Sequence, residues 1–306
     1  MRILLLGGSG LVGSNLAPLA HKRGHQTIAW SGSWPGEIPG AERTVRIDLT
    51  DLDAVQSAIL DLFPDAIINA AGVTEPAHCQ QDPRGSALLN VELPERLARL
   101  AHHLSARFIH FSSEQVFDGS RPPYRAADKP DPTNLYGRQK AESEKRVLDA
   151  APETAIVLRV PLLTGNSLRG TRSLHERLFG LWSRNQAARL YHDEIRQPCS
   201  ADNLAALAVE LCERNDLQGI QHWAGAEPLS RFEMGRRILQ RFGLPEDLVI
   251  RSSRLDDPES THRPADLSMD LTGLAGIVKT PRQDFADQLD RMIVPIPFRE
   301  WFNTLG

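Results

Sequence analysis

The sequence predicts an α/β protein, built on a doubly wound parallel sheet with a smaller C-terminal lobe. An apolar run, Ile3 to Leu6, breaks into glycines and is followed by a helical pattern over Leu11 to Lys22. That order is typical of a buried strand, a tight turn and a helix. Short apolar runs then alternate with helical stretches, which predicts parallel strands joined by right-handed crossovers. Such crossovers place the carboxyl ends of the strands at one edge of the sheet, where we expect a ligand.

The glycines after the first strand have the spacing of a phosphate-binding turn. Gly8, Gly10 and Gly13 satisfy G-x-G-x-x-G, and Gly7 starts an overlapping G-x-x-G-x-x-G. Glycine lets the backbone approach a pyrophosphate, and the next helix points free N–H groups and its positive dipole end at that group. The alternative is a structural turn without a ligand. We expect a Rossmann domain whose pyrophosphate contacts are Gly7, Gly10, Leu11, Val12 and Gly13.

Composition argues against several classes of function. The chain has 306 residues, of which 41% are hydrophobic and 24% charged, and its net charge is −4. That charge favours neither nucleic acid nor an anionic membrane, and no run approaches the ~18 apolar residues of a membrane span. The run at Ile3 to Leu6 is too short for a signal peptide. Cys79, Cys199 and Cys212 match no metal spacing, so we expect no metal and reduced thiols in a cytoplasmic protein.

The end of the second expected strand, Gln26 to Trp30, bears on the choice of cofactor. An acidic residue there would bind the ribose 2′-hydroxyl of NAD and repel the 2′-phosphate of NADP. Here Ser31 and Ser33 follow, and no acid precedes Glu37. Because hydroxyls can bond a phosphate, we expect NADP rather than NAD, although no arginine stands beside them. The alternative is that both serines are solvated loop residues.

Further strands and helices continue the alternation. Strands are expected at Thr44 to Ile47, Ala66 to Ile68 and Phe108 to Phe111. Thr50 or Asp51 is expected to cap the next helix, and a second helix is expected over residues 88–104. Small residues follow the strand at Ala66 to Ile68, where they let a flat ligand lie against the backbone.

Tyr136 and Lys140 stand four residues apart in a helical stretch that follows a proline-rich turn, so they share a face. A free tyrosine has a pKa near ~10, and a nearby ammonium favours the phenolate and moves that pKa toward the working range. Alone, Tyr-x-x-x-Lys would describe a solvated helix face. Here it follows a dinucleotide turn, and Ser113 ends the preceding strand where it can meet the same cleft. We therefore expect Ser113, Tyr136 and Lys140 to be catalytic.

With these motifs the chain resembles the extended short-chain dehydrogenase/reductases, and within them the dTDP-4-dehydrorhamnose reductase branch. The superfamily is indicated by GGSGLVG at the start, INAAG at Ile68 to Gly72, FSSEQVFDG at Phe111 to Gly119 and NLYGRQKAESEK at Asn134 to Lys145. The branch is indicated by LRVPLLTG at Leu158 to Gly165, QPCSADNLA at Gln197 to Ala205 and HRPADLSMD at His262 to Asp270. PPYRAADKPDPTNLYG and QHWAGAEPLSRFEMG also resemble the regulatory β subunit of methionine adenosyltransferase, a cofactor-binding partner protein of the same fold.

The resemblance implies roles for the matching residues. Ser113 would hydrogen-bond the substrate carbonyl, Tyr136 would donate the proton, and Lys140 would hold the nicotinamide ribose. Tyr136 and Lys140 thus also border the cofactor. Further cofactor contacts are implied at Ser31, Asp48, Leu49, Ala70, Ala71 and Gly72. Substrate contacts are expected at Thr74, Glu114, Arg196 and Arg263.

Each of the two arginines has a simpler alternative role. The sequence also departs from the branch at two places that would border the sugar, so the identity of the sugar is not predicted. Arg263 would meet a diphosphate or form a surface ion pair, and Arg196 would meet a phosphate or be solvated. Glu114 and Gln115 stand where the branch often has an aspartate and an aromatic residue. Val160-Pro161 replaces Ser-Trp.

The domain division follows from the same reading. We expect residues 1–160 and about 190–225 to form the NAD(P)-binding Rossmann domain. Residues from about 161–189 and 226–306 would form the substrate-binding lobe, with a helix over 231–242. The segment 193–203 is expected to return to the main sheet and line the cleft.

The implied function is an NAD(P)H-dependent reductase that transfers hydride to the keto group of a nucleotide-linked deoxysugar. One alternative is a nucleotide-sugar epimerase or dehydratase, which would keep and recycle NAD. The other is a non-catalytic, cofactor-binding regulatory subunit. We expect a nucleotide-sugar substrate as the partner, no nucleic acid and no membrane, with a homodimer as a candidate assembly.

Overall fold

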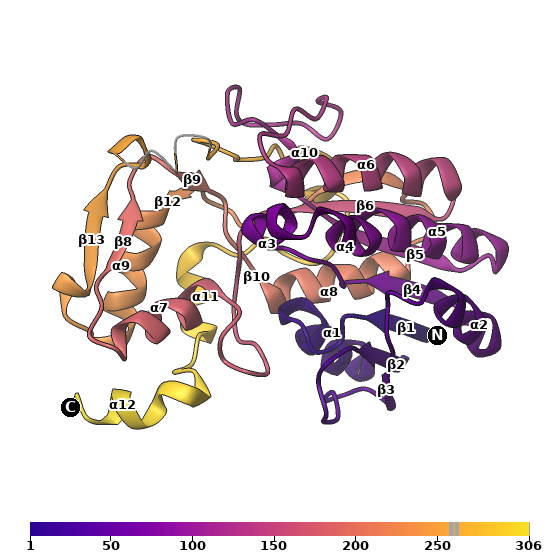
Figure 1. The fold of residues 1–306 in the computed structure, drawn as a ribbon, viewed down its shortest axis with the longest axis horizontal. Helices are drawn as coiled ribbons and strands as arrows, with labels where there is room; N and C mark the ends of the chain where they lie inside the picture. The colour runs from indigo at the N-terminus through magenta and orange to yellow at the C-terminus, as the bar shows by residue number, and fades with distance from the viewer. Residues whose placement is uncertain (257–259, 261–262, 306) are drawn as a thin grey trace.

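The computed structural model describes residues 1–256, 260 and 263–305. Its centre is a seven-stranded sheet of order β11-β6-β5-β4-β1-β2-β3, in which every pair of neighbours is parallel (Figure 1). The strands are β1 (Arg2–Leu6), β2 (Gln26–Ser31), β3 (Arg43–Arg46), β4 (Ala66–Asn69), β5 (Arg107–Ser113), β6 (Ala155–Val160) and β11 (Gly219–His222). The chain winds outward from β1 to β3 and then returns to β4 on the other side of β1. The predicted doubly wound sheet is confirmed, with its switch point between β1 and β4.

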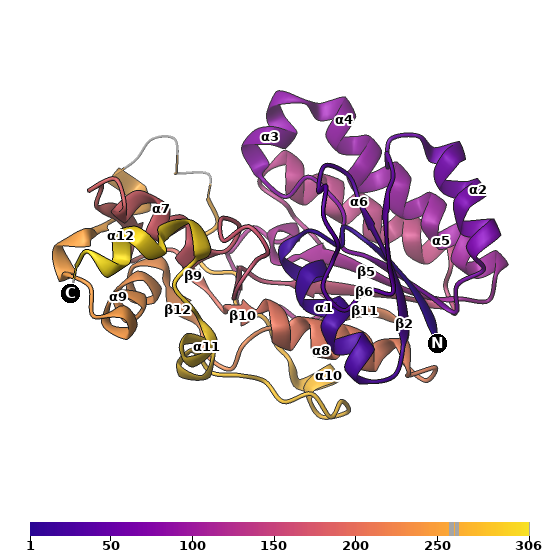
Figure 2. The same ribbon diagram turned by 90° about the horizontal axis from the view of Figure 1, so that it is seen from below.

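Helices cover both faces of the sheet (Figure 2). Ile3 and Leu5 of β1 pack in one core cluster with α1 (Leu11–Lys22) and α8 (Ala201–Cys212). Leu4 and Leu6 point to the opposite face, where they pack in a second cluster. The helices of that cluster are α2 (Leu52–Leu62), α5 (Leu93–His103) and α6 (Leu135–Ala150). Because β1 is buried on both faces, it is continuously apolar rather than alternating.

The segment after β4 contains the helix expected over residues 88–104, but its first turn is π-helical and two short helices precede it. It is built from α3 (Pro76–Gln81), α4 (Pro83–Ala87), a π-helical turn η1 (Leu88–Glu92) and then α5. In that turn Asn90 points inward: it accepts from Val73 N at 2.9 Å and donates to Val73 O and Gln139 at 2.9 Å each. Asn90 therefore fixes the loop after β4, and the expected helix is confirmed, with a π-helical first turn that the sequence did not predict.

A second group of elements lies beside the sheet, where Figure 2 shows α7, α9 and α12 together. It contains α7 (Leu174–Trp182), α9 (Arg231–Phe242), α11 (Phe285–Arg291), α12 (Arg299–Asn303) and the parallel pair β8 (Ala188–Tyr191) and β13 (Val249–Ser252). Phe179, Trp182, Met234 and Phe285 are buried in its own apolar core. The helix predicted over 231–242 is confirmed. The domain boundaries given above stay a prediction.

The segment 193–203 does not join the main sheet, so that expectation was wrong. β9 (Ile195–Arg196) pairs antiparallel with β12 (Leu229–Ser230), and β10 (Cys199–Ser200) pairs with β7 (Leu163–Thr164). The seventh strand of the sheet is β11 instead. The remaining short elements are α10 (Thr272–Ala275) and the 3₁₀ turns η2 (Glu114–Val116), η3 (Glu246–Leu248), η4 (Arg254–Asp256) and η6 (Ile296–Phe298).

Candidate active site

The glycine turn after β1 has the geometry that a pyrophosphate requires. Gly7 has a φ of +76°, and a Cβ at Gly13 would lie 2.3 Å from the Gly7 carbonyl oxygen, so α1 can start this close to β1 only without side chains. Gly10 begins α1 with no side-chain cap, and no acidic residue stands in the first turn. Amides of the first turn have no partner within a helix. They are therefore available to an anion, and Leu11 and Val12 lie in that turn.

The predicted cofactor contacts after β4 lie beside this turn, and those after β3 follow the strand at the edge of the sheet. Ala70 and Ala71 directly follow β4, and a Cβ at Gly7 would come within 2.6 Å of the Ala70 carbonyl oxygen. Asp48 is exposed, and hydrogen bonds from the Thr50 backbone and hydroxyl lower the pKa of its carboxyl. Leu49 is half-buried against the core cluster of α2, α5 and α6.

Two other predicted residues lie in the loop after β4. Gly72 has a φ of +156°, and a Cβ there would approach Asn90 Oδ1 to 2.8 Å. Thr74 is exposed in the same loop. The next residue, Glu75, forms an ion pair with Arg177 of α7, so this loop contacts the second group of elements.

Near the residues expected to contact the adenosine ribose, the structure excludes a solvated position for Ser31 and brings Arg46 next to it. Ser31 is the last residue of β2 and only 1% exposed, with its hydroxyl donating to Trp34 O at 3.4 Å, so it is not a solvated loop residue. Ser33 is exposed. Arg46 pairs with Ser31 across β2 and β3, and its Nε donates to Gly32 O at 3.2 Å. Sequence reasoning missed Arg46 because it comes from the neighbouring strand; the expected strand order would have pointed to it.

The structure brings Ser113, Tyr136 and Lys140 to the carboxyl end of β5. Ser113 ends that strand, and Lys140 Nζ donates to Phe111 O on the same strand at 2.7 Å. Tyr136 is 6% and Lys140 5% exposed, both on the inward face of α6. Asn134 caps α6 by accepting from Gly137 N at 2.8 Å. A Cβ at Gly137 would lie 2.1 Å from Gln115 O, so the absence of a side chain lets α6 approach the turn after β5.

Burial sets the protonation of this trio. It raises the pKa of Tyr136, although a hydrogen bond with the Ser113 side chain opposes that effect. Burial also lowers the pKa of Lys140 to about 8, against the opposing charge of Glu144. The expectation that Lys140 lowers the pKa of Tyr136 was wrong for this arrangement, because the amine lies at the Phe111 carbonyl. Tyr136 is therefore a neutral phenol at neutral pH, the form that can donate a proton.

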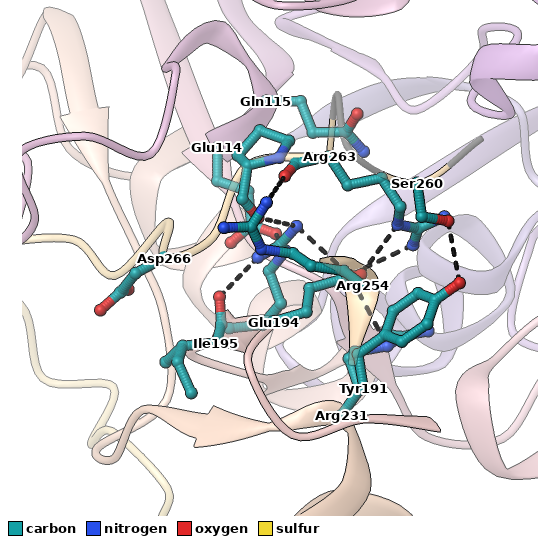
Figure 3. A network of polar contacts seen from close by, with 12 residues as sticks. Glu114, Gln115, Tyr191, Glu194, Ile195, Arg231, Arg254, Ser260, Arg263 and Asp266 are labelled. Atoms are coloured by element: carbon teal, nitrogen blue, oxygen red, sulfur yellow. Dashed lines mark hydrogen bonds and ion pairs between the residues drawn. The ribbon is translucent and has the colours of Figure 1, made fainter. Parts of the chain in front are cut away.

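A buried network of carboxylates and arginines lies next to Ser113 and includes three predicted substrate residues (Figure 3). Arg196 Nε lies 3.2 Å from Glu114 Oε1, and its Nη2 lies 3.3 Å from Glu194 Oε1. Arg196 also donates to the carbonyls of Ile195 at 2.6 Å and of Pro264 at 3.2 Å. Arg196 is buried, so the solvated alternative was wrong.

Arg263 bonds to the same network from outside. It donates to both oxygens of Glu194, at 2.8 and 3.2 Å, from a half-exposed side chain. The ion pair proposed as its simpler alternative is therefore present, with a buried carboxylate. His262, which begins the motif containing Arg263, lies outside the described residues.

The pKa values of the two carboxyl groups are shifted in opposite directions, because burial dominates at one and the arginines dominate at the other. Burial raises the pKa of Glu114 to about 8, although Arg196 opposes this. Among the residues that the structure describes, Glu114 Oε2 has no hydrogen-bond partner. Burial also acts to raise the pKa of Glu194, but Arg196, Arg263 and Arg231 hold it below its usual value. Sequence reasoning missed Glu194 and Arg231. Glu194 stands two residues before the predicted Arg196, and Arg231 comes from the distant helix α9, so only folding brings Arg231 to Glu194.

The rest of the described structure bears on metals, membranes and cysteines. In the part of the chain that the structure describes, no three His, Cys, Asp or Glu side chains are grouped as a metal would need. None of the described helices combines the length and apolar character needed to cross a membrane. All three cysteines are buried and free.

Comparisons with known proteins give a family model, similar sequences and similar structures. A family model described as the RmlD substrate binding domain matches residues 1–296. Methionine adenosyltransferase 2 subunit beta of Xenopus tropicalis is 34% identical over 310 residues, covering 99% of this chain and 91% of that protein. A hypothetical dTDP-4-dehydrorhamnose reductase from Sulfolobus tokodaii has a TM-score of 0.81 at 29% identity, covering 96% of this chain and 100% of the other.

A third comparison concerns a structure with a bound cofactor. The dTDP-4-dehydrorhamnose reductase of Bacillus anthracis, solved in complex with NADP, has a TM-score of 0.81, covering 95% of this chain and 96% of the other. At 19% identity it supports a shared fold alone. Both resemblances drawn from the sequence motifs are confirmed by these relatives. The chain belongs to the family of the RmlD substrate binding domain.

Proposed function

We propose that this protein is an NAD(P)H-dependent reductase that transfers hydride to the keto group of a nucleotide-linked deoxysugar. The observation that carries the proposal is the placement of Ser113, Tyr136 and Lys140, buried together at the end of β5, on the sheet edge that also holds the glycine turn. The likeness to a hypothetical dTDP-4-dehydrorhamnose reductase at 29% identity supports it. The proposed domain division assigns this trio to residues 1–160, and Arg231 and Arg263 to the substrate-binding lobe.

The proposed chemistry follows from what each side chain can do. The bound nicotinamide supplies the hydride. Tyr136, a neutral phenol, protonates the oxygen of the keto group, and Ser113 donates a hydrogen bond to the same oxygen as charge develops on it. Lys140 has three donors. It can therefore keep its bond to Phe111 O and also donate a hydrogen bond to a ribose hydroxyl. Its ammonium would supply the proton that replaces the one lost by Tyr136.

We propose NADP as the preferred cofactor. The pyrophosphate would lie at Gly7, Gly10, Leu11, Val12 and Gly13, the adenine at Asp48 and Leu49, and the nicotinamide side along Ala70, Ala71 and Gly72. The 2′-phosphate would lie against Arg46, which pairs with Ser31 across β2 and β3, and against the hydroxyl of Ser33, because a guanidinium matches a phosphate with paired donors. The Ser31 hydroxyl would have to give up its bond to Trp34 O to join them. Thr74 would border the sugar.

The experiment is a panel of nucleotide-linked 4-keto-6-deoxysugars, followed by the absorbance of reduced nicotinamide. We expect stoichiometric loss of NADPH with at least one thymidine-linked member. Isomerisation without net loss of NADPH would instead favour an epimerase. An unchanged rate for Tyr136→Phe would remove that residue from the mechanism.

A regulatory subunit is the second candidate. It is favoured by the 34% identity to a methionine adenosyltransferase β subunit across nearly the whole chain. It predicts no turnover on any member of the panel and stable co-purification with an adenosyltransferase. An intact catalytic trio does not separate the two candidates, because a regulatory subunit can retain it; turnover does.

A further inference from the structure

A buried ion pair between α6 and β6 lies next to the catalytic trio. Glu144 is 2% exposed and Arg159 is 1% exposed. Arg159 Nη2 donates to Glu144 Oε2 at 2.7 Å, and its Nε donates to Glu144 Oε1 at 2.9 Å, so the guanidinium meets the carboxylate with paired donors. Replacing such a pair with apolar residues is often neutral or stabilising, so stability alone does not account for it.

The position of Glu144 follows from the spacing of α6. Tyr136, Lys140 and Glu144 stand four residues apart, so they share the inward face of the helix, where all three are buried. The carboxylate is held from the sheet. Arg159 of β6 is the register partner of Ser112 on β5, and Ser112 Oγ also donates to Glu144. Two neighbouring strands therefore fix this carboxylate one helical turn from Lys140.

The remaining contacts of Arg159 are with uncharged groups. Its Nη1 donates to Ala126 O at 3.2 Å and lies 3.4 Å from His222 Nε2, and its guanidinium carbon lies 4.9 Å from the centre of the Phe117 ring. Burial and the charge of Arg159 lower the pKa of His222 to about 4, so this imidazole is neutral at neutral pH. Among the described residues, Glu144 is therefore the carboxylate that the guanidinium meets.

The described groups that face Lys140 from other positions are uncharged at neutral pH. Burial raises the pKa of the Cys79 thiol of α3, and burial together with Lys140 holds the pKa of His110 on β5 well below its usual range. Burial also raises the pKa of Tyr136, which is a neutral phenol. Glu144 differs from these groups, because its charge favours the ammonium of Lys140 against the effect of burial.

We propose that Glu144 is a positioning residue: it keeps Lys140 charged in its buried position, and Arg159 limits how strongly it does so. This rests on the proposed function, because it serves the step in which Lys140 replaces the proton that Tyr136 loses. In that step an N–H bond of the ammonium breaks, an O–H bond forms on the phenolate, and the amine regains a proton from water. The guanidinium partly cancels the field of the carboxylate, so the ammonium stays charged and can still give up its proton.

The test measures the protonation of Lys140 directly. The chain has five lysines, so carbon-13 labelling at lysine Cε gives five signals whose chemical shifts follow protonation. The signal missing from Lys140→Arg identifies Lys140. Titrations of the whole chain from pH 5 to 10.5 would compare the wild type with Glu144→Gln, Arg159→Gln and the double variant that carries both changes.

The expected shifts have opposite signs. Glu144→Gln leaves the charge of Arg159 unopposed, so the titration midpoint of Lys140 should fall by about 1–2 pH units. Arg159→Gln leaves Glu144 unopposed and should raise the midpoint by about 1 pH unit. The double variant removes both charges and should return the midpoint to within about 0.5 pH unit of the wild type. Glu142→Gln, which removes an exposed carboxylate that bonds Arg146 on the same helix, is the control and should leave the midpoint unchanged.

This pattern separates an electrostatic role from a structural one. Loose packing would shift both single variants in the same direction and the double variant further. The proposal is overturned if Glu144→Gln leaves the midpoint of Lys140 unchanged, or if the two single variants shift it in the same direction. If Glu144→Gln does not fold, a midpoint that does not rise in Arg159→Gln overturns it. Failure of the keto-sugar panel would count against the reductase alone, because these titrations require no turnover.

Discussion

Replacing Glu114 with glutamine should change how stability depends on pH. The pKa of Glu114 rises from 4.5 to about 8 in the folded protein, chiefly through burial. The folded state therefore holds this proton more tightly than the unfolded state. As the pH rises from 5 to 8 the unfolded chain loses the proton while the folded chain keeps it, so the free energy of unfolding falls. The slope is about 1.4 kcal/mol per pH unit, or about 4 kcal/mol over this window, and it levels off above pH 8.

Glutamine has nearly the same shape and does not titrate, so this contribution is absent from Glu114→Gln. Urea unfolding followed by tryptophan fluorescence, at intervals from pH 5 to pH 8.5, gives both free energies of unfolding. We expect the variant to gain on the wild type as the pH rises, by up to about 4 kcal/mol. Glu153→Gln, at an exposed glutamate, is the control and should show no such trend. Parallel curves for Glu114→Gln and the wild type would refute the view that Glu114 is buried as an acid.

Three further outcomes test the cofactor and proton-transfer roles. Tyr136→Phe should lower turnover by ~10²–10⁴-fold while NADPH binding, followed by fluorescence titration, stays within about twofold. Gly13→Ala should weaken NADPH binding by about 10-fold or more, because the new Cβ would lie 2.3 Å from Gly7 O; Gly273→Ala, which meets nothing within 4 Å, is the control and should bind normally. Arg46→Gln should weaken NADPH binding by about 10-fold and leave NADH binding unchanged, and an equal effect on both would place Arg46 away from the 2′-phosphate.

The parts of the protein that the sequence predicted are those determined by local constraints. The turn between β1 and α1 needs glycine at Gly7 and Gly13, because a Cβ at either position would overlap other backbone atoms. Tyr136 and Lys140 share a face of α6 because four residues make about one helical turn. Both features could be read from short spacings.

The features that were missed depend on contacts between distant segments. Arg46 reaches the end of β2 through strand pairing, and Arg231 approaches Glu194 only in the folded chain. The π-helical turn at Leu88–Glu92 follows from the bonds of Asn90 to Val73 and Gln139, which no periodicity encodes. The ionisation of Tyr136 and Glu114 depends on burial, which spacing alone does not give.

The bond between Lys140 Nζ and Phe111 O means that this side chain is preorganised. A lysine free in solvent samples many rotamers, and fixing it costs about 1.5–2 kcal/mol of side-chain entropy. Here folding has already met that cost, so a dinucleotide that docks against the ammonium does not have to immobilise it. Affinity for such a ligand therefore depends in part on how firmly β5 and α6 pack together. A substitution that loosens this packing would weaken ligand binding even though the substituted residue does not contact the ligand.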